Sequence, residues 1–415
     1  MVFSRRDFLK GSALLSIGTT NSSLLKGALA FGQQHPASTN FAQQGKILIL
    51  VQLAGGNDGI QTVVPGGDPA YRTARPKLAI PQEQLLPLGE GFGFAPGMTG
   101  LKSLWDKGKL AVVRGVGYPE QSYSHFKSMA IWESGDPELA LSNGWLGRTL
   151  DAMESEMHDP FFGFKAGAGV PPELRGEHIP IPAVANVPDY GFKTRGQPAS
   201  ASDARVATLM KLYEEYPSNS RYGVLLETTA DTAVSSSAAL AKVHAAYTAK
   251  AEYPETPFAS ALQLLAEAIT GGLGIRVGHC TLGGFDTHSN QVADHPALLA
   301  TLDAGLSAFY ADLEAHGRAD DVLVLTWSEF GRRVQENANE STDHGSASVL
   351  FALGNGVRGG FYGDQPSLSK LIDNGNLSFT TDFRRVYATV IEDWLGVPSA
   401  PLLGREWDKL GFLAA

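Results

Sequence analysis

Five short apolar runs constrain the fold of this chain more than any other feature. The first, residues 46–54 (KILILVQLA), is nearly continuous, which is typical of a strand buried on both faces of a parallel sheet. Segments with helical periodicity, such as residues 257–272 and 296–317, lie between the runs. Strands that alternate with long helices predict an α/β fold with a doubly wound, mostly parallel sheet and helices on both faces. The other four runs are residues 109–117, 274–282, 321–327 and 347–354.

Residues 151–250 interrupt this alternation. They are rich in proline and glycine at first, and they become helical in pattern at residues 201–216 and 236–250. We interpret them as an inserted helical and irregular cap between the second and third strands. The remainder then predicts one α/β domain that spans residues 46–415 and carries this insertion.

The N-terminus has the pattern of an export signal. Arg5 and Arg6 precede a weakly apolar stretch that ends in Ala-Leu-Ala at residues 28–30. A basic start, a short apolar region and a small-residue cleavage site form a signal peptide rather than a membrane span, and paired arginines are typical of the twin-arginine route. We expect residues 1–30 to be this signal, recognised by the twin-arginine translocase, and residues 31–45 to be a disordered lead-in. The mature protein would be periplasmic or extracellular.

Charge and cysteine content exclude several classes of protein. The formal net charge is −10 at pH 7, and an acidic surface argues against a nucleic-acid partner because phosphate binding needs clustered Lys and Arg. Cys280 is the single cysteine, so an intrachain disulfide is impossible and stability must come from a core. After the signal, no segment offers eighteen uninterrupted apolar residues, so the mature form is expected to have no transmembrane span.

Acidic, histidine and serine side chains border each apolar run. In open α/β sheets, ligands bind outside the carboxyl ends of the strands, so groups that follow parallel strands are expected to meet in one place. The candidates are Asp58 after the first run, Ser122, Ser124 and His125 after the second, Asp286 and His288 after the third, Ser328, Glu329 and Arg332 after the fourth, and Asp343 and His344 before the fifth.

Carboxylates and imidazoles in one place suit Zn²⁺, Mn²⁺, Fe or Mg²⁺ at a hydrolytic centre, with a serine such as Ser124 as nucleophile. Simpler interpretations stay open: Asp58 in Asn-Asp-Gly could close a turn, Asp343 could cap a helix or close an Asx-turn, and Ser124 could be an ordinary loop serine. His279 lies inside the third run and is interpreted as a core histidine. The histidines interpreted as solvated are His158, His178, His244, His295 and His316.

A set of motifs resembles a known family. The segments LVQLAGGNDGIQTVVP, YSHFKSMAIWESG, GWLGRTLD, GGFDTHSNQ, TWSEFGRRVQENAN with TDHG, and GNGVRGGFYGDQPSL occur in this order over nearly the whole mature chain. They look like an uncharacterised family of twin-arginine-exported bacterial proteins that is grouped with the alkaline phosphatase and sulfatase superfamily. This resemblance implies an alkaline-phosphatase-like α/β core.

The resemblance also implies roles for single residues. Asp58 resembles the superfamily's first metal-ligand aspartate, and Ser124 stands where the nucleophile is placed, with Ser122 as the alternative. Asp286 and His288 look like an Asp-and-His pair of one metal, and His344 with Asp343 resembles the late histidine ligand. Glu329 stands in place of an Asp-His pair, so the resemblance leaves open whether one or two ions bind. The formylglycine motif C-x-P-x-R is absent, which argues against a formylglycine sulfatase.

Two functions follow as expectations. The first is an exported hydrolase that acts on a small anionic phosphate or sulfate ester with a divalent metal ion (Zn, Mn, Ca or Mg). In it Ser124 attacks, His125 and Arg332 assist or bind the anion, and Asp58, Asp286, His288, Glu329, Asp343 and His344 hold the metal. The second is a non-catalytic binding or assembly protein that uses the same core to bind an envelope component.

Overall fold

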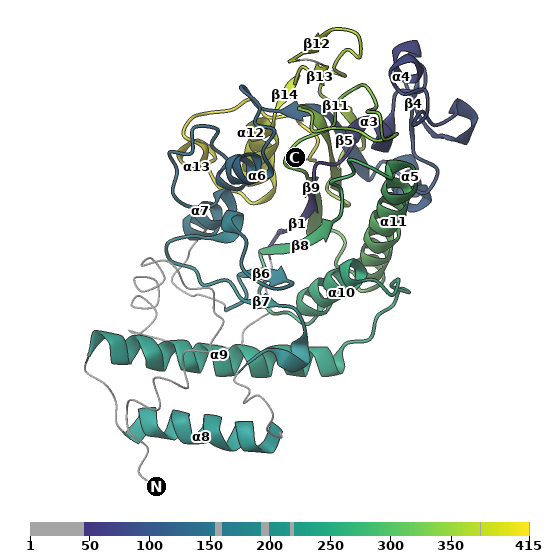
Figure 1. The fold of residues 1–415 in the computed structure, drawn as a ribbon. Coiled ribbons are helices and arrows are strands. Elements are labelled where there is room, and N and C mark those ends of the chain that lie inside the picture. The colour runs from purple at the N-terminus through teal and green to yellow at the C-terminus, as the bar shows by residue number, and fades with distance from the viewer. Residues whose placement is uncertain (1–44, 154–159, 192–198, 216–219, 374, 415) are drawn as a thin grey trace.

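The computed structural model describes residues 45–153, 160–191, 199–215, 220–373 and 375–414 (Figure 1). The predicted signal peptide, residues 1–30, and residues 31–44 of the predicted lead-in lie outside the described residues, so both stay predictions. Within the described part, no helix has the length and apolar character that a membrane crossing requires.

All five predicted strands form, and they belong to one sheet. Within the described residues this sheet has nine strands in the order β11-β5-β10-β9-β1-β8-β6-β7, with β14 beside β5. Its strands are β1 (Ile47–Ala54), β5 (Leu110–Gly117), β6 (Gly163–Ala166), β7 (Ala183–Val184), β8 (Val277–Gly283), β9 (Val322–Trp327), β10 (Ser348–Leu353), β11 (Gly360–Tyr362) and β14 (Thr381–Asp382).

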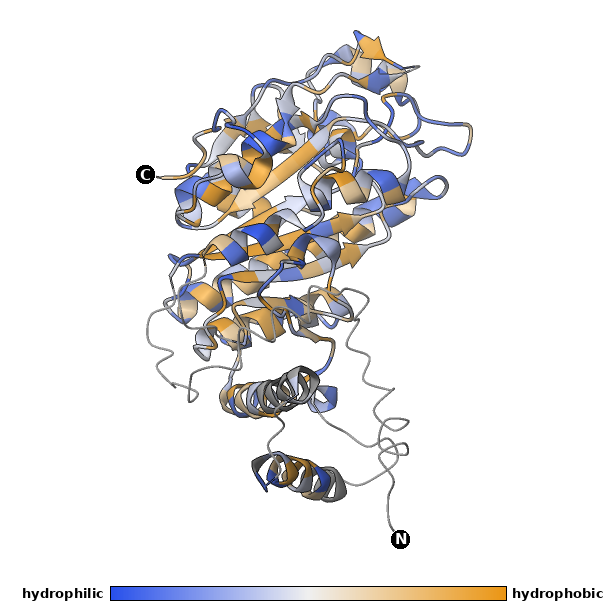
Figure 2. Cartoon of the chain, turned by 90° about the vertical axis from the view of Figure 1, so that its left-hand side faces the viewer, coloured by the Kyte–Doolittle hydropathy of each residue, from blue (hydrophilic) through white to orange (hydrophobic). Residues whose placement is uncertain are grey.

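Helices cover both faces of the sheet, as the apolar runs predict (Figures 1 and 2). Alternate side chains of β1 enter different cores: Ile49 and Val51 belong to one buried cluster, and Leu48 and Leu50 to another. The first cluster is covered by α5 (Thr99–Asp106), α10 (Pro257–Thr270) and α11 (Gln291–Ala315), and the second by α6 (His125–Ser134), α7 (Trp145–Ala152), α12 (Phe383–Thr389) and α13 (Ala400–Leu403). The fold is therefore α/β, with two cores on one sheet.

One predicted strand runs in the opposite direction from the others. β5, β8 and β9 have the same direction as β1, whereas β10 pairs antiparallel with both β9 and β5. No helix lies between β9 and β10, and a chain that returns without a crossover helix pairs antiparallel. The reversal places the segment that precedes β10 at the same edge as the segments that follow β1, β5, β8 and β9.

The predicted insertion, residues 151–250, is only partly a cap. Its first part contributes β6, which pairs parallel with β8, and β7, which pairs parallel with β6. These strands have four and two residues, too short to give a periodic signal in the sequence. The second part forms α8 (Ala199–Glu215) and α9 (Arg221–Ala246), which lie beyond β7 at one end of the molecule (Figure 1).

The remaining elements are short and flank the sheet. A three-stranded sheet has the order β2-β4-β3, and a hairpin pairs β12 with β13. These elements are α3 (Gly59–Thr62), β2 (Val63–Val64), α4 (Pro69–Ala74), η1 (Gln82–Gln84), β3 (Leu86–Gly89), β4 (Phe92–Phe94), η2 (Pro172–Leu174), η3 (Val187–Asp189), β12 (Leu371–Ile372), β13 (Asn376–Leu377) and the π-helical turn η4 (Val390–Trp394).

Candidate metal centre

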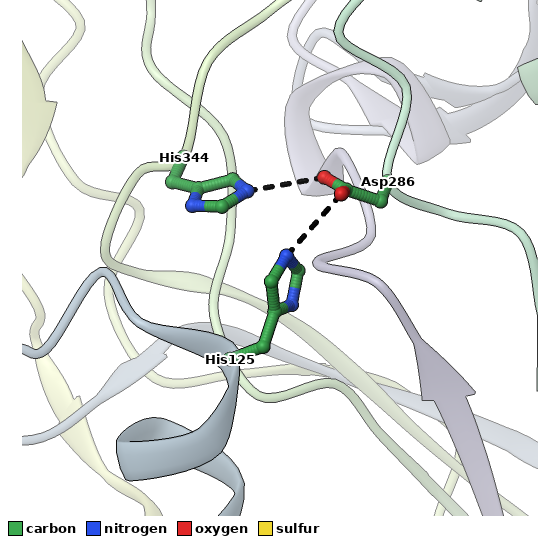
Figure 3. Close-up of side chains that lie close together, drawn as sticks. All are labelled: His125, Asp286 and His344. Atoms are coloured by element: carbon green, nitrogen blue, oxygen red, sulfur yellow. Dashed lines mark hydrogen bonds and ion pairs between the residues drawn. The ribbon is translucent and has the colours of Figure 1, made fainter.

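Three histidines from different segments meet one aspartate at the carboxyl edge of the sheet. His125 is the first residue of α6, Asp286 and His288 follow β8, and His344 precedes β10. One ligand atom from each of His125, Asp286 and His344 lies within 4.8 Å of the other two (Figure 3). The structure therefore brings these strand-end segments together, while the role of their side chains as ligands stays a prediction.

His125 is held by a buried carboxylate on one side and faces Asp286 with the other. Its Nδ1 lies 2.7 Å from Oε1 of Glu329, which also accepts the Gly55 backbone N–H at 2.9 Å. Its Nε2 lies 3.3 Å from Oδ2 of Asp286 and is buried, with no hydrogen-bond partner among the described residues. The ring therefore donates from Nδ1 to Glu329 and presents the Nε2 lone pair to the cluster.

The other two imidazoles have the same arrangement. His288 Nδ1 lies 3.3 Å from Oδ1 of Asp343, and its Nε2 lies 3.1 Å from Oδ1 of Asp286. His344 Nδ1 lies 2.8 Å from the Tyr123 carbonyl oxygen, and its Nε2 lies 3.0 Å from the same Asp286 oxygen. The two Nε2 atoms are 2.9 Å apart. Each ring is thus anchored at Nδ1 and converges on Asp286 at Nε2.

In this geometry the Nε2 atoms of the imidazole rings direct their lone pairs toward one region next to Asp286. A carbonyl oxygen can only accept, so His344 Nδ1 carries a hydrogen and the Nε2 of the neutral ring carries a lone pair. Burial lowers the pKa of His344, which favours that neutral form at pH 7. Lone pairs that face a carboxylate repel it unless a cation lies between them. Anchoring of one ring nitrogen by a carbonyl or carboxylate is also the pattern that metal-ligating histidines show.

Arg332 holds Asp286 in position. Its Nη2 donates to Oδ1 of Asp286 at 2.8 Å. Burial raises the pKa of this carboxyl, but its contacts with His344 and with the Arg332 guanidinium outweigh burial and lower the pKa to about 2. The guanidinium is buried, and within the described part of the chain its other donors reach only backbone carbonyl oxygens, those of Gly55, Gly56, Phe285 and Thr342. Arg332 therefore fixes the loops around the cluster, and its donors are already committed rather than directed at an anion.

The loop after β1 must approach this cluster closely. Gly55 has φ +122°, and a Cβ there would lie 2.4 Å from the Asp286 backbone nitrogen. Only glycine fits both the backbone conformation and the space. The Gly-Gly pair after β1 thus lets two strand-end loops touch behind the cluster.

The donor set fits a borderline transition metal ion. Imidazole nitrogens suit Zn²⁺, Fe, Ni or Cu, whereas Mg²⁺ and Ca²⁺ take oxygen ligands. Three histidines with one carboxylate therefore fit zinc or iron, and they fit neither the magnesium nor the calcium of the sequence-based expectation. His125, His288, His344 and Asp286 would be the ligands, with Glu329, Asp343 and the Tyr123 carbonyl behind the rings.

Asp58 is committed to other partners. It is buried, caps α3, and forms an ion pair of 2.7 Å with Arg75 Nη1. Its Oδ2 also accepts from Gln291 Nε2 at 2.6 Å. Burial raises its pKa, but Arg75 outweighs burial and keeps the carboxyl ionised. Asp58 is not among the side chains that converge on Asp286, and Arg75 supplies the positive charge that the sequence-based reading assigned to a metal.

The two serines lie beside the cluster. Ser124 is exposed and is the N-cap residue of α6, yet its side chain makes no capping hydrogen bond. Ser122 is half-buried, and its hydroxyl accepts the Ser124 backbone N–H at 3.3 Å. Between the two, Ser124 has the freer hydroxyl and is the immediate neighbour of His125.

The predicted residues fall into two groups, those that converge on Asp286 and those that hold the imidazole rings in place. His125, predicted as catalytic, lies in the cluster itself, while Glu329 and Asp343, predicted as ligands, hold the Nδ1 atoms of His125 and His288. The Tyr123 carbonyl was missed, because a backbone acceptor leaves no signal in the sequence. His295 was interpreted as solvated but is buried, with Nε2 3.1 Å from Asn57 Oδ1.

Comparison with solved structures finds low-identity matches. A sulfatase from Pseudoalteromonas sp. matches at 11% identity over 95% of this chain and 76% of its own, with a TM-score of 0.41. An alkaline phosphatase superfamily protein from Vibrio parahaemolyticus matches at 9% identity over 93% and 78%, with a TM-score of 0.36. A phosphonate monoester hydrolase from Silicibacter pomeroyi matches at 12% identity over 88% and 78%, with a TM-score of 0.32. Because these TM-scores are below 0.5, neither the fold nor the activity of this chain is inferred from them.

Sequence comparison assigns the family. No curated protein matches the chain. Residues 111–401, more than two thirds of the chain, match the model of a family described as protein of unknown function, DUF1501. The matched segment contains His125, Asp286, His288 and His344, whereas Asp58 lies outside it. The chain is a member of the DUF1501 family.

Proposed function

We propose that this protein is an exported, metal-dependent hydrolase that cleaves a phosphate or sulfate ester, with the metal ion held by His125, His288, His344 and Asp286. One observation carries the proposal: three Nε2 atoms converge on one carboxylate while an acceptor anchors each Nδ1. Ion pairs between the histidines and Asp286 would not require that every Nδ1 atom is also held by an acceptor.

The N-terminus of α6 supplies a second feature beside the cluster. This helix of ten residues begins at His125, its first turn has no acidic residue, and its N-cap residue, Ser124, makes no capping hydrogen bond with its side chain. Uncapped N–H groups and the helix dipole favour an anion at this position. Lys127, exposed in the same turn, adds a positive charge. An anionic ester group bound here would lie next to both the cluster and the Ser124 hydroxyl.

The roles of the side chains follow from this placement. When bound, a zinc or iron ion would polarise the ester oxygen and lower the pKa of bound water or alcohol. Ser124 is the proposed nucleophile, because its hydroxyl is exposed at the helix N-terminus. Glu329 and Asp343 keep the Nδ1–H groups of His125 and His288 in place, and Arg332 orients Asp286.

The test combines metal analysis with an ester screen. The full mature chain, purified from its own host, should contain about one zinc or iron ion per molecule and hydrolyse phosphate or aryl sulfate esters. His288→Ala should lose both the metal and the activity, whereas Ser124→Ala should lose activity and keep the metal. His244→Ala is the matched control, because His244 pairs with Glu267 on α10 and lies outside the cluster. Absence of metal from the correctly folded wild type would overturn the proposal.

A second candidate is a non-catalytic binding protein of the cell envelope. Two observations favour it. Arg332, which was expected to bind the substrate anion, bonds to backbone carbonyl oxygens, and Asp58, which was expected to hold metal, pairs with Arg75. Stoichiometric metal without turnover of any ester, together with unchanged behaviour of Ser124→Ala, would favour this candidate.

A further inference from the structure

A hydrogen-bonded row of buried charged and polar side chains lies on β6, β8 and η2, and none of its members belongs to the candidate metal centre. Lys165 of β6 places its Nζ 2.8 Å from Nδ1 of His279, which is on the neighbouring strand β8. His279 Nε2 lies 2.7 Å from Oε1 of Glu173 in η2. Lys165 and His279 are buried, and so is Glu173.

The direction of these hydrogen bonds is fixed by chemistry. The Lys165 ammonium can only donate, so His279 Nδ1 accepts and its Nε2–H donates to Glu173. The other carboxylate oxygen of Glu173 is buried and has no partner in the portion of the chain that the structure describes. Burying such groups costs free energy, and well-packed apolar residues often stabilise a core equally well. Stability alone therefore does not explain why these three polar side chains are buried together.

The hydrogen-bonded row reaches the protein surface at its Lys165 end. Lys165 Nζ also lies 2.8 Å from Oγ1 of Thr281, which is exposed. Two residues further along β8, Gly283 is exposed, and a Cβ added there would meet nothing within 4 Å. Asp286 of the metal centre follows three residues later. Thr281 and Gly283 thus form an exposed strip, the β8 strip, that begins beside Lys165 and leads to Asp286.

The strip also borders the helix that carries His125. Thr281 pairs in register with Gln52 of β1, and Gln52 Nε2 contacts the Met129 sulfur at 3.7 Å. Met129 is one turn after His125 on α6, so the two side chains share a face of the helix. Gln52 precedes Gly55 by three residues, about 10 Å along an extended strand. Thr281, which contacts Lys165, therefore lies about 10 Å along the strand direction from the Gly55 loop, which touches the cluster.

We propose that Lys165, with Thr281, is a second anion-binding point of the site, which holds a second charged group of the substrate while the β8 strip accommodates the link to the ester. The proposal rests on the proposed function and specifies its substrate as a doubly anionic molecule. Gly283 leaves the strip open because it has no side chain. His279 and Thr281 take two of the three N–H groups of the Lys165 ammonium, so among the described residues one N–H remains for a ligand. A bound anion favours the charged form of the amine.

Binding of matched ligands to the zinc-loaded full mature chain tests this inference. Hexyl phosphate has one anionic group, and hexanediol bisphosphate places a second one at the other end of the same carbon chain. Calorimetric titration should show the bisphosphate binding at least about tenfold more tightly, as expected for one added charge-assisted contact. Lys165→Met should abolish this preference and leave hexyl phosphate binding and zinc content unchanged.

A second variant tests the strip without removing a buried group. Gly283→Leu adds a side chain in open space and should abolish the same preference by blocking the link. Lys102→Met is the control, because Lys102 pairs with Asp106 on the exposed side of α5 and should leave the preference intact. Equal affinities of both ligands in the wild type, or a preference that survives both Lys165→Met and Gly283→Leu, would overturn the inference. Failure of both ligands to bind would instead contradict the proposed function on which it rests.

Discussion

At the scale of single residues, the site depends on which nitrogen each imidazole presents. Glu329, Asp343 and the Tyr123 carbonyl each engage an Nδ1 atom, so the three Nε2 atoms are left to face Asp286. A histidine that is free to rotate would lose rotamer entropy on binding a metal ion, and a ring held in place loses less. The groups behind the rings would therefore contribute to the affinity for a metal ion in addition to the ligands themselves.

Replacing Glu329 tests this division of roles. Glu329→Gln keeps the size of the side chain but removes the negative charge that holds the Nδ1–H of His125. We expect zinc affinity, measured by competition with a chromophoric chelator, to fall about 10- to 100-fold. Glu314→Gln, at an exposed partner of Lys109, should have no effect. Unchanged affinity in Glu329→Gln would show that His125 needs no anchor.

His295 predicts a pH dependence of stability. Burial lowers the pKa of His295 to about 4 in the folded protein, from 6.5 when exposed. The unfolded chain then binds a proton that the folded one does not, so stability falls as pH decreases from about 6.5 to 4. This group contributes on the order of 3 kcal/mol to that loss. Urea unfolding of His295→Gln should show a shallower decrease over this range than the wild type, and parallel curves would contradict the assignment.

At the scale of elements, the direction of β10 decides which segments meet. His344 precedes its strand, whereas Asp286 follows β8, and they share an edge only because β10 runs antiparallel to β9. Long-range contacts also connect the loops, since Arg75 at the end of α4 bonds Asp58 and the carbonyl oxygens of Arg333 and Val334. The Arg75 side chain therefore connects α4 with α3 and with the segment after β9 through an ion pair and hydrogen bonds.

Loss of Arg75 should therefore destabilise the protein strongly. Arg75→Gln leaves Asp58 buried and without its cation, which costs about 3–5 kcal/mol in other buried pairs. Arg72→Gln, on the exposed side of the same helix, is expected to change stability by less than about 0.5 kcal/mol. Denaturant unfolding of both variants measures the difference, and similar stabilities would mean that the Arg75 pair adds little.

The sequence predicted elements better than it predicted pairings. The five apolar runs became strands because continuous burial on both faces leaves a clear pattern. β6 and β7 were missed within the predicted insertion because strands of four and two residues have no measurable period. The roles of Asp58 and Arg332 were not foreseeable, because their partners Arg75 and Asp286 are set by tertiary contacts.

At the scale of the whole molecule, the chain combines one α/β body with two long helices at its end. The sheet with its two cores accounts for the body (Figure 1), and the candidate metal centre lies at the carboxyl edge of this sheet. The formal charge of −10 is compatible with a small substrate more readily than with nucleic acid. The predicted twin-arginine route carries folded proteins, so the protein could be exported with the metal ion already bound.

The twin-arginine prediction is tested on the whole protein. Replacing Arg5 and Arg6 together, as Arg5→Lys and Arg6→Lys, keeps the charge but removes the paired arginines. Cell fractionation should show the full-length precursor retained in the cytoplasm instead of the shorter mature chain outside it. Export of the double variant at the wild-type rate would show that another route is used.

The central claim concerns the position of a metal ion, so anomalous diffraction addresses it most directly. Crystals of the protein from its own host, measured on both sides of the zinc or iron absorption edge, should give one strong anomalous peak. We predict that it lies about 2.0–2.2 Å from the Nε2 atoms of His125, His288 and His344 and from a carboxylate oxygen of Asp286. A well-ordered structure with no peak among these four side chains, or with the peak elsewhere, would contradict the account.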